Sequence, residues 1–409
     1  MADFFQNGSI TTLHNLTHRS LEELESDLME FKERRPLMLM IPSLYSELQR
    51  PALENIKNHL KEVTYLEHLV IGLDQANEDE YRHAIEYFSD MPFKTTVIWN
   101  HGPRMQALHK QLIEQGLAPT EEGKGKNVWY STGFVLSQSV DAVVALHDAD
   151  ITTYSREMLA KLFYPVSNHN FGFYFTKGFY PRWADNKLNG RVCRLLVTPL
   201  VRALQTVVGH MPYLEYIDSF RYPLAGEFAM RTSVMKDVKI PSDWGLEIGI
   251  LTEMQRTFST HRICQVDLGD QYDHKHQCLS PDDHTKGLSK MATDISKAFF
   301  RKLATYGVVM TQETFRSIKA TYYRTALDLV ESYRKDAIFN GLEFNIHAEE
   351  KAVELFASTV MEAGISFLEN PMETPFISCW RRVTSAIPDA FEQINDAVAK
   401  DMEEFGAAR

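Results

Sequence analysis

Residues 143–151, "VVALHDADI", contain the pattern that decides the fold class and the position of a site. Four apolar residues are followed by His147 and then by two carboxylates, Asp148 and Asp150, on either side of one alanine. The apolar run has the length and composition of a buried strand. Carboxylates at its end are the hard oxygen ligands that Mg²⁺ or Mn²⁺ prefers, and the ion keeps positions open for phosphate oxygens. A pair of turn-forming aspartates before the next helix is the alternative interpretation.

The segments before this strand alternate between strand and helix patterns. Apolar runs at residues 37–44, 66–74 and 94–100 predict three strands, and helical periodicity fills the intervals between them. This alternation predicts a mostly parallel central sheet flanked by helices, which is an α/β fold. Ligands of such sheets bind beyond the carboxyl ends of the strands, where Asp148 and Asp150 lie.

The pattern changes twice along the chain. "SLEELESDLMEFKERR" begins with a capping box of Ser20 and Glu23 and predicts an N-terminal helix. Residues from about Lys290 onward have helical periodicity and no obvious chemistry. We therefore predict three parts, which are a helical segment at 1–35, an α/β domain at 36–285 with parts 36–155 and 156–285, and a helical C-terminal region at 286–409.

Composition limits the classes of partner. The 409 residues carry a formal net charge of −12, which argues against broad binding to nucleic acid or to an anionic membrane. No apolar run approaches the ~20 residues needed to span a bilayer, and the N-terminus does not resemble a signal peptide. The four cysteines form no CxxC pair, which favours a reduced, cytoplasmic setting; they are Cys193, Cys264, Cys278 and Cys379.

Two further segments contain candidate ligands. In "YDHKHQ", His274 and His276 would point to the same face of an extended chain, so that one imidazole can complete the metal site; a polar surface loop is the alternative. In "NKLNGRVCRLL", Gly190 precedes a long helix, and Arg191 and Arg194 follow it. Free N–H groups at a helix start, together with arginine, suit a phosphate or carboxylate. Solvated arginines in a glycine-containing loop are the alternative here.

Carboxylates and a lysine stand out in three other segments. "EEGKGKN" lacks the spacing of a P-loop and is predicted as a flexible basic loop from which Lys124 can reach a diphosphate. "PLAGE" and "WGLEIG" place Glu227 and Glu247 among apolar residues and glycines, which is unusual for solvating groups. Glu247 can bond sugar hydroxyls or act as a base. The alternatives are a solvated turn for the lysine and caps or buried ion pairs for the glutamates.

In their order along the chain, these segments resemble the retaining glucosyl-3-phosphoglycerate synthases of glycosyltransferase family 81. The resemblance covers roughly residues 39–276 and is closest at 223–250. It implies a GT-A nucleotide-sugar-binding fold with a donor part at 36–155 and an acceptor part at 156–285. The matching segments are "IPSLYSE", "GKG", "DAD", "GRV", "PLAGEFA", "WGLEIGIL" and "QVDLGDQYDHKH".

The resemblance also implies the role of each matching residue. The donor-binding residues would be Pro42, Ser43, Glu47, Lys124, Asp148, Ala149 and Glu247. The metal ligands would be Asp148, Asp150 and His274, holding Mg²⁺ or Mn²⁺, and the catalytic residues Glu247, Lys124 and Arg191. The acceptor-binding residues would be Gly190, Arg191, Val192, Cys193 and His276.

The sequence departs from the family pattern in four places. Cys193 replaces a hydroxyl donor, and His276 stands where an asparagine is expected. "IGLDQAN" lacks the usual acidic, serine-rich turn, so no nucleotide contact is assigned there. The long C-terminal helical region is absent from shorter members of the family.

The expected activity is the retaining transfer of glucose from UDP-glucose to 3-phosphoglycerate, a step toward the compatible solute glucosylglycerate. The resemblance further implies a homodimer. A mannosyl-3-phosphoglycerate synthase using GDP-mannose is the nearest alternative, because sugar choice depends on hydroxyl contacts around Glu247. A non-catalytic GT-A-like nucleotide-binding protein and a nucleotidyltransferase are further alternatives from other classes.

Overall fold

The computed structural model describes residues 6, 8–17, 19–242, 245–274, 287–372 and 376–406. Its centre is an eight-stranded sheet in the order β1–β10–β6–β9–β5–β2–β3–β4. The strands are β1 (Thr11–Leu13), β2 (Leu37–Leu44), β3 (His68–Asp74), β4 (Lys94–Trp99), β5 (Val143–Leu146), β6 (Phe175–Phe179), β9 (Phe228–Arg231) and β10 (Ile263–Asp267), with a separate hairpin of β7 (Trp183–Ala184) and β8 (Lys187–Leu188).

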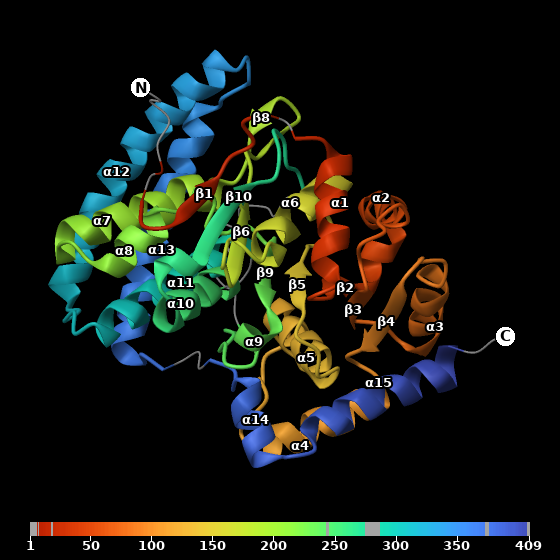
Figure 1. The fold of residues 1–409 in the computed structure, drawn as a ribbon. Coiled ribbons are helices and arrows are strands. Elements are labelled where there is room, and N and C mark those ends of the chain that lie inside the picture. The colour runs from red at the N-terminus through yellow and green to blue at the C-terminus, as the bar shows by residue number, and fades with distance from the viewer. Residues whose placement is uncertain are drawn as a thin grey trace.

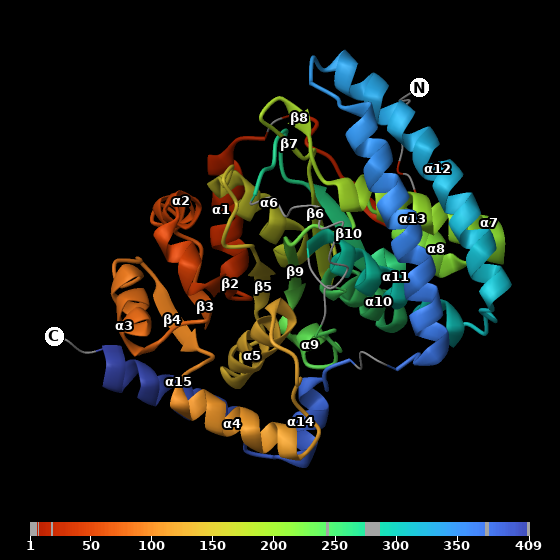
Figure 2. The same cartoon turned by 180° about the vertical axis from the view of Figure 1, so that it is seen from behind.

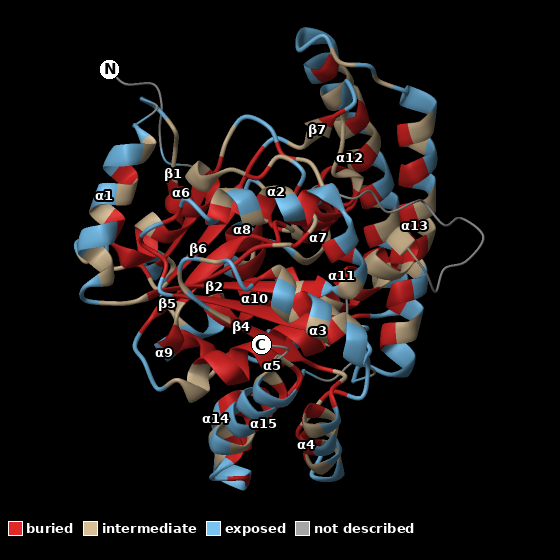
Figure 3. Ribbon diagram, turned by 90° about the vertical axis from the view of Figure 1, so that its right-hand side faces the viewer, coloured by how far each residue is buried: buried red, intermediate tan, exposed pale blue. Residues whose placement is uncertain are grey.

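All neighbouring strands of the large sheet are parallel, except that β9 runs antiparallel to β5 and β6. Helices cover both faces of the sheet (Figure 1). The sequence-based prediction of a mostly parallel sheet flanked by helices is therefore confirmed. The near-continuous apolar runs arise because parallel strands are buried on both faces, as the colouring of the strands in Figure 3 shows.

The helices follow the strands in sequence as expected for an α/β fold. The helices up to residue 274 are α1 (Leu21–Lys32), η1 (Tyr45–Gln49), α2 (Pro51–Leu60), α3 (Glu78–Tyr87), α4 (Pro103–Glu114), α5 (Lys124–Ser137), α6 (Arg156–Ser167), η2 (Val192–Val197, a π-helix), α7 (Thr198–Val208), α8 (Pro212–Asp218), α9 (Thr232–Met235), α10 (Leu246–Thr257) and η3 (Thr260–Arg262). The later ones are α11 (Gly287–Thr305), α12 (Gln312–Phe339), α13 (Ile346–Glu369), α14 (Trp380–Ala386) and α15 (Ala390–Gly406).

Alternate residues of β2 enter different hydrophobic layers, because side chains alternate between the faces of a sheet. Met38 and Met40 pack in the layer that includes residues of α5 and α7, whereas Leu39 and Ile41 pack in the layer with α2 and α6. The register of β2 against β5 pairs Met40 with Leu146. The residues that follow these two strands therefore emerge side by side at one edge of the sheet.

The C-terminal helices cover two separate parts of the α/β domain. The α11–α13 group packs on α7 and η2, while α15 crosses to α3, α4 and α5 (Figures 1 and 2). Trp380 of α14 stacks on Trp129 of α5 with ring centroids 4.4 Å apart. Each indole N–H donates to a backbone carbonyl, Trp129 to Ser378 and Trp380 to Trp129. The division of the chain at residues 35 and 285 stays a prediction.

Candidate active site

A cavity of about 670 Å³ lies at the carboxyl ends of β2, β3 and β5. Every predicted site residue that the structure describes lines this cavity. They are Pro42, Ser43, Glu47, Lys124, Asp148, Ala149, Asp150, Gly190, Arg191, Val192, Cys193, Glu247 and His274. His276 lies outside the described residues. Six separate stretches of the chain thus meet in one place, while the role of each residue stays a prediction.

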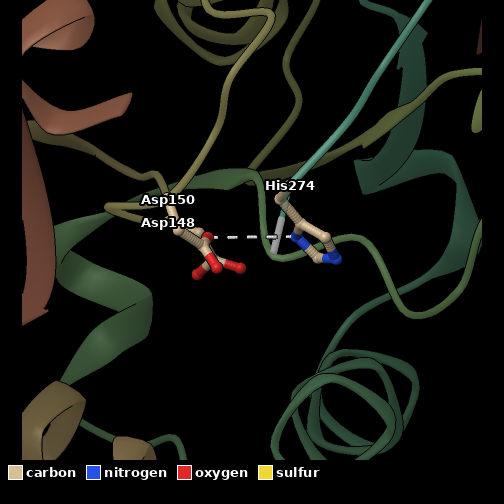
Figure 4. A group of neighbouring side chains, drawn as sticks. All are labelled: Asp148, Asp150 and His274. Atoms are coloured by element: carbon tan, nitrogen blue, oxygen red, sulfur yellow. Dashed lines mark ion pairs between the residues drawn. The ribbon is translucent and has the colours of Figure 1, made fainter. Parts of the chain in front are cut away.

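Asp148, Asp150 and His274 form a cluster with the geometry of a metal site (Figure 4). One ligand atom of each residue lies within 4.8 Å of those of the others, and Nδ1 of His274 is 3.9 Å from Oδ1 of Asp150. An antiparallel bridge between Ile151 and His274 brings the two segments together. Two carboxylates and an imidazole are a donor set that fits Mg²⁺ or Mn²⁺.

The electrostatics of the two aspartates differ. Burial, and next the charge of Asp148, raise the pKa of Asp150 to about 6. Burial also acts to raise the pKa of Asp148, but the neighbouring ammonium of Lys124 outweighs it and lowers that pKa. His147, just before them, is fully buried against Tyr154, and burial lowers its pKa to about 3. His147 therefore stays neutral and serves the core rather than the cavity.

Lys124 connects the aspartates to Glu247. Its Nζ lies 2.6 Å from Oδ1 of Asp148 and 3.2 Å from Oε1 of Glu247. Burial acts to lower the pKa of Lys124, and the two carboxylates overcome it and raise that pKa. Lys124 is therefore an ammonium at neutral pH, placed between an aspartate at the metal cluster and a carboxylate predicted to meet the donor sugar.

The predicted flexible loop over residues 121–127 is wrong in its second half, because α5 begins at Lys124. Gly123 is the N-cap with φ of +148°, a conformation that favours glycine. A Cβ on Gly125 would lie 2.3 Å from the carbonyl oxygen of Pro241. The two glycines thus let the backbone turn and approach its neighbour closely, and the helix start fixes the lysine.

Glu227 lies behind the cavity and does not line it. It is fully buried and accepts hydrogen bonds from the hydroxyls of Tyr180 at 2.6 Å and Tyr272 at 2.8 Å. Burial, and next the charge of Asp148, raise the pKa of Glu227 to about 7. A Cβ on Gly226 would meet Oδ2 of Asp148 at 2.4 Å. The "AGE" segment therefore packs directly against the first aspartate and supports it.

The far end of the cavity contains the predicted acceptor residues. Gly190 has φ of +73°, and a Cβ there would lie 2.9 Å from the hydroxyl of Tyr222. The next residues form η2, in which Cys193 is buried, and burial raises the pKa of its thiol to about 12. Arg191 donates through Nε to Oε1 of Glu349 at 2.7 Å. A carboxylate of α13 thus lies at the edge of the acceptor end.

Sequence reasoning did not identify several residues that line the cavity. Asp74 ends β3 and Gln75 follows it, and His101 lies shortly after the end of β4. The rule that ligands lie beyond strand ends, applied to "IGLDQ" and "VIWNH", would have found these three. Arg182 and Tyr222 also line the cavity, but they come from connections whose position depends on tertiary packing, for which the sequence offers no such signal.

Curated relatives match nearly the whole chain. The glucosyl-3-phosphoglycerate synthase of Persephonella marina is 44% identical over 401 residues, covering 98% of this chain and 99% of the relative. The glucosyl-3-phosphoglycerate synthase of Methanococcoides burtonii is 39% identical over 407 residues, covering 98% and 99%. No protein-family model matches the chain.

Solved structures share the fold. Glucosyl-3-phosphoglycerate synthase from Mycobacterium tuberculosis in complex with Mn²⁺, UDP-glucose and phosphoglyceric acid superposes with a TM-score of 0.53 at 21% identity, covering 72% of this chain and 88% of that one. The same enzyme with Mg²⁺ and UDP gives a TM-score of 0.51, covering 72% and 86%. These likenesses place the chain among GT-A folds, as predicted.

Proposed function

The chain belongs to the glucosyl-3-phosphoglycerate synthase family, and on that premise we propose that it transfers glucose from UDP-glucose to 3-phosphoglycerate with retention of anomeric configuration. One observation carries the proposal beyond family membership. A single cavity contains an oxygen-and-imidazole cluster at one end and an arginine beside a helix start at the other. This pairing suits a nucleotide sugar at one end and a small anionic acceptor at the other.

At the donor end, Asp148, Asp150 and His274 would hold the metal ion. A bound Mg²⁺ or Mn²⁺ supplies Lewis-acid neutralisation of the diphosphate leaving group. Lys124 adds positive charge at the same place, since its raised pKa keeps it protonated. Glu247 accepts hydrogen bonds from the sugar hydroxyls, and Pro42, Ser43 and Glu47 contact the nucleotide.

At the acceptor end, Arg191 and the backbone around Gly190, Val192 and Cys193 hold the phosphate or carboxylate of 3-phosphoglycerate. Fixing that anion brings the acceptor hydroxyl to the anomeric carbon, which is a proximity effect. The predicted site residues offer no secure nucleophile for a double displacement. We therefore assign a front-face substitution, in which the leaving diphosphate helps to take the proton of the acceptor hydroxyl. A product with inverted configuration would contradict this mechanism.

The location and assembly of the protein are part of the same proposal. Among the described residues, no helix has the length and apolar character to cross a bilayer. We propose a cytoplasmic homodimer that contributes to glucosylglycerate synthesis. Sedimentation equilibrium of the purified chain tests the dimer, and a mass of 47.1 kDa would identify a monomer instead.

The reaction is tested by incubating the enzyme with 3-phosphoglycerate, Mg²⁺ and either UDP-glucose or GDP-mannose, and identifying the product by NMR. Glucosyl-3-phosphoglycerate with an α-linkage, formed from UDP-glucose alone, supports the proposal. A mannosyl product formed only from GDP-mannose would favour the alternative donor. Nucleotide binding without any glycosyl product would indicate a non-catalytic GT-A protein.

A further inference from the structure

The helical hairpin of α12 and α13 contacts the stretch that carries the predicted acceptor residues, residues 186–197, here called the acceptor segment. At one end, the backbone N–H of Glu343 donates to the carbonyl of Asn186 at 2.8 Å. At the other, the buried hydroxyl of Tyr322 donates to the carbonyl of Leu195 at 2.6 Å. Figure 2 shows α12 and α13 running side by side next to this part of the molecule. The hairpin thus holds both ends of the acceptor segment.

Glu349 of α13 contacts the middle of the acceptor segment through both of its carboxylate oxygens. Oε1 accepts from Nε of Arg191 at 2.7 Å, and Oε2 accepts from Nη2 of Arg194 at 2.9 Å. The side chain of Glu349 is only 4% exposed, whereas that of Arg191 is 37% exposed and lines the cavity. One buried carboxylate therefore holds two arginines, of which one faces the site.

Arg194 is the fixed member of this pair. It donates to the carbonyls of Asn189 and Leu188, and its guanidinium lies 4.8 Å from the ring centroid of Tyr333 in α12. These contacts anchor the carboxylate of Glu349 from the side away from the cavity. Arg191 is held through Nε, so the edge formed by its two Nη groups is left for a bidentate anion.

We propose that Glu349 is a positioning residue for the acceptor, which orients Arg191 so that its Nη edge receives the anionic group. The hairpin of α12 and α13 then contributes to acceptor binding. This inference rests on the function proposed above, and it assigns a role in acceptor affinity to a residue of the C-terminal helical region, for which the sequence analysis predicted no role. The reaction step itself stays with the residues that line the cavity.

Removing Glu349 has two opposed effects on an anionic acceptor. Loss of its negative charge would strengthen acceptor binding, while release of Arg191 would weaken it. Both oxygens already accept from guanidinium groups, so the charge of Glu349 is compensated locally and its field at the acceptor is small. The loss of orientation therefore dominates, and acceptor binding should weaken about tenfold, as expected when one charge-assisted hydrogen bond no longer fixes a binding group.

The test measures KM for 3-phosphoglycerate and for UDP-glucose in the full-length enzyme with Mg²⁺. Glu349→Gln and Glu349→Asp are both expected to raise KM for 3-phosphoglycerate about tenfold and to leave KM for UDP-glucose within about twofold. The aspartate variant keeps the charge and withdraws the carboxylate by one methylene group. A KM for 3-phosphoglycerate that rises in both variants shows that Glu349 acts by orienting Arg191. A KM for 3-phosphoglycerate that is unchanged or lowered in either variant overturns the proposal.

Two comparisons exclude a general structural effect. Glu354→Gln changes the same residue type on α13, where Glu354 pairs with Lys351 at the surface, and should leave both KM values unchanged. In an Arg191→Ala background, Glu349→Gln should add less than about twofold to the acceptor KM, because contacting residues are not additive. Full additivity would overturn the proposal. Loss of folded enzyme lowers kcat without changing KM.

The outcome can be separated from a failure of the proposed function. If the wild type forms no glucosyl product from UDP-glucose, the proposed function is wrong. Hydrogen exchange of the acceptor segment still tests Glu349, since it needs no substrate. Faster exchange at residues 188–197 in Glu349→Gln than in Glu354→Gln supports the positioning role, and equal exchange overturns it.

Discussion

The ammonium nitrogen of Lys124 lies 2.6 Å from Oδ1 of Asp148, so the first of the two aspartates after β5 forms an ion pair with a cation of the protein. Lys124 is the first residue of α5, and Asp148 lies two residues after the end of β5. A diphosphate that reaches the metal cluster therefore also reaches this lysine. In the proposed mechanism, Lys124 and the metal ion would therefore share the neutralisation of the leaving diphosphate.

Replacing Lys124 by methionine keeps the length of the side chain and removes its charge. We expect kcat for UDP-glucose to fall about 100- to 1000-fold, the loss typical of one preorganised charge-stabilising group. Steady-state kinetics at saturating Mg²⁺ measure it. Lys110→Met, at an exposed position of α4, is the matched control and should keep wild-type kcat. Equal activity of the two variants would remove Lys124 from the mechanism.

Replacing His274 by alanine removes the nitrogen ligand of the predicted metal cluster. The Mn²⁺ concentration for half-maximal activity should rise at least about tenfold, because even outer partners of a metal site are worth 10- to 100-fold in affinity. Titration of activity with Mn²⁺ measures the change, and His261→Ala at the exposed η3 serves as its control. An unchanged Mn²⁺ requirement in His274→Ala would show that the imidazole is not a ligand.

Buried His68 makes stability depend on pH. It lies on β3 with Nε2 2.9 Å from Oγ1 of Thr96, and burial, followed by Lys94, lowers its pKa from 6.5 to about 4. Between pH 6.5 and 4 the unfolded chain binds a proton at His68 that the folded chain does not, so stability is lost as pH falls. From pH 7.5 to 5 the loss is about 2 kcal/mol.

Urea denaturation at pH 7.5 and pH 5 tests this contribution. The His68→Gln variant lacks the titrating group, so its free energy of unfolding should change by about 2 kcal/mol less between the two pH values than that of the wild type. Identical pH dependence in the two proteins would mean that the pKa of His68 is the same in the folded and the unfolded chain.

Truncating Trp380 to alanine tests whether α14 and α15 are integral to the α/β domain. Its indole stacks on Trp129 and is 1% exposed, so removal should cost about 3–5 kcal/mol in the free energy of unfolding. Chemical denaturation measures it. Phe339→Ala, at a side chain that is 89% exposed, should stay within about 0.5 kcal/mol of wild type. A small, similar cost at both positions would contradict integral packing.

Local patterns in the sequence were sufficient for β2, β3, β4 and β5 and for the two aspartates after β5, whereas β1, β6 and β10 were not predicted. The apolar run before Asp148 and Asp150 encodes a parallel strand, and the strand-end rule places its carboxylates in a cavity. The antiparallel β9 was not predicted, because a four-residue strand such as Phe228–Arg231 has too little periodicity to show its direction. The strand itself coincides with the "GEFAMR" segment that adjoins the site.

Contacts between distant segments could not be predicted from local patterns. Glu349 is one of many glutamates in helical sequence, and only the packing of α13 on η2 brings it to Arg191. The helical start at Lys124 was missed for a related reason. Gly123 and Gly125 disfavour a helix by intrinsic propensity, yet the positive φ of Gly123 and the close approach of Gly125 to Pro241 favour glycine at these positions.

The most direct test of the account compares wild type with Asp150→Asn in the formation of glucosyl-3-phosphoglycerate from UDP-glucose and 3-phosphoglycerate, with Mg²⁺ and with EDTA. We expect metal-dependent product from the wild type and a loss of at least about 100-fold in Asp150→Asn, because the proposed role of Asp148, Asp150 and His274 is to hold the metal ion of the donor. Product that forms equally in EDTA, or undiminished in the variant, would contradict it.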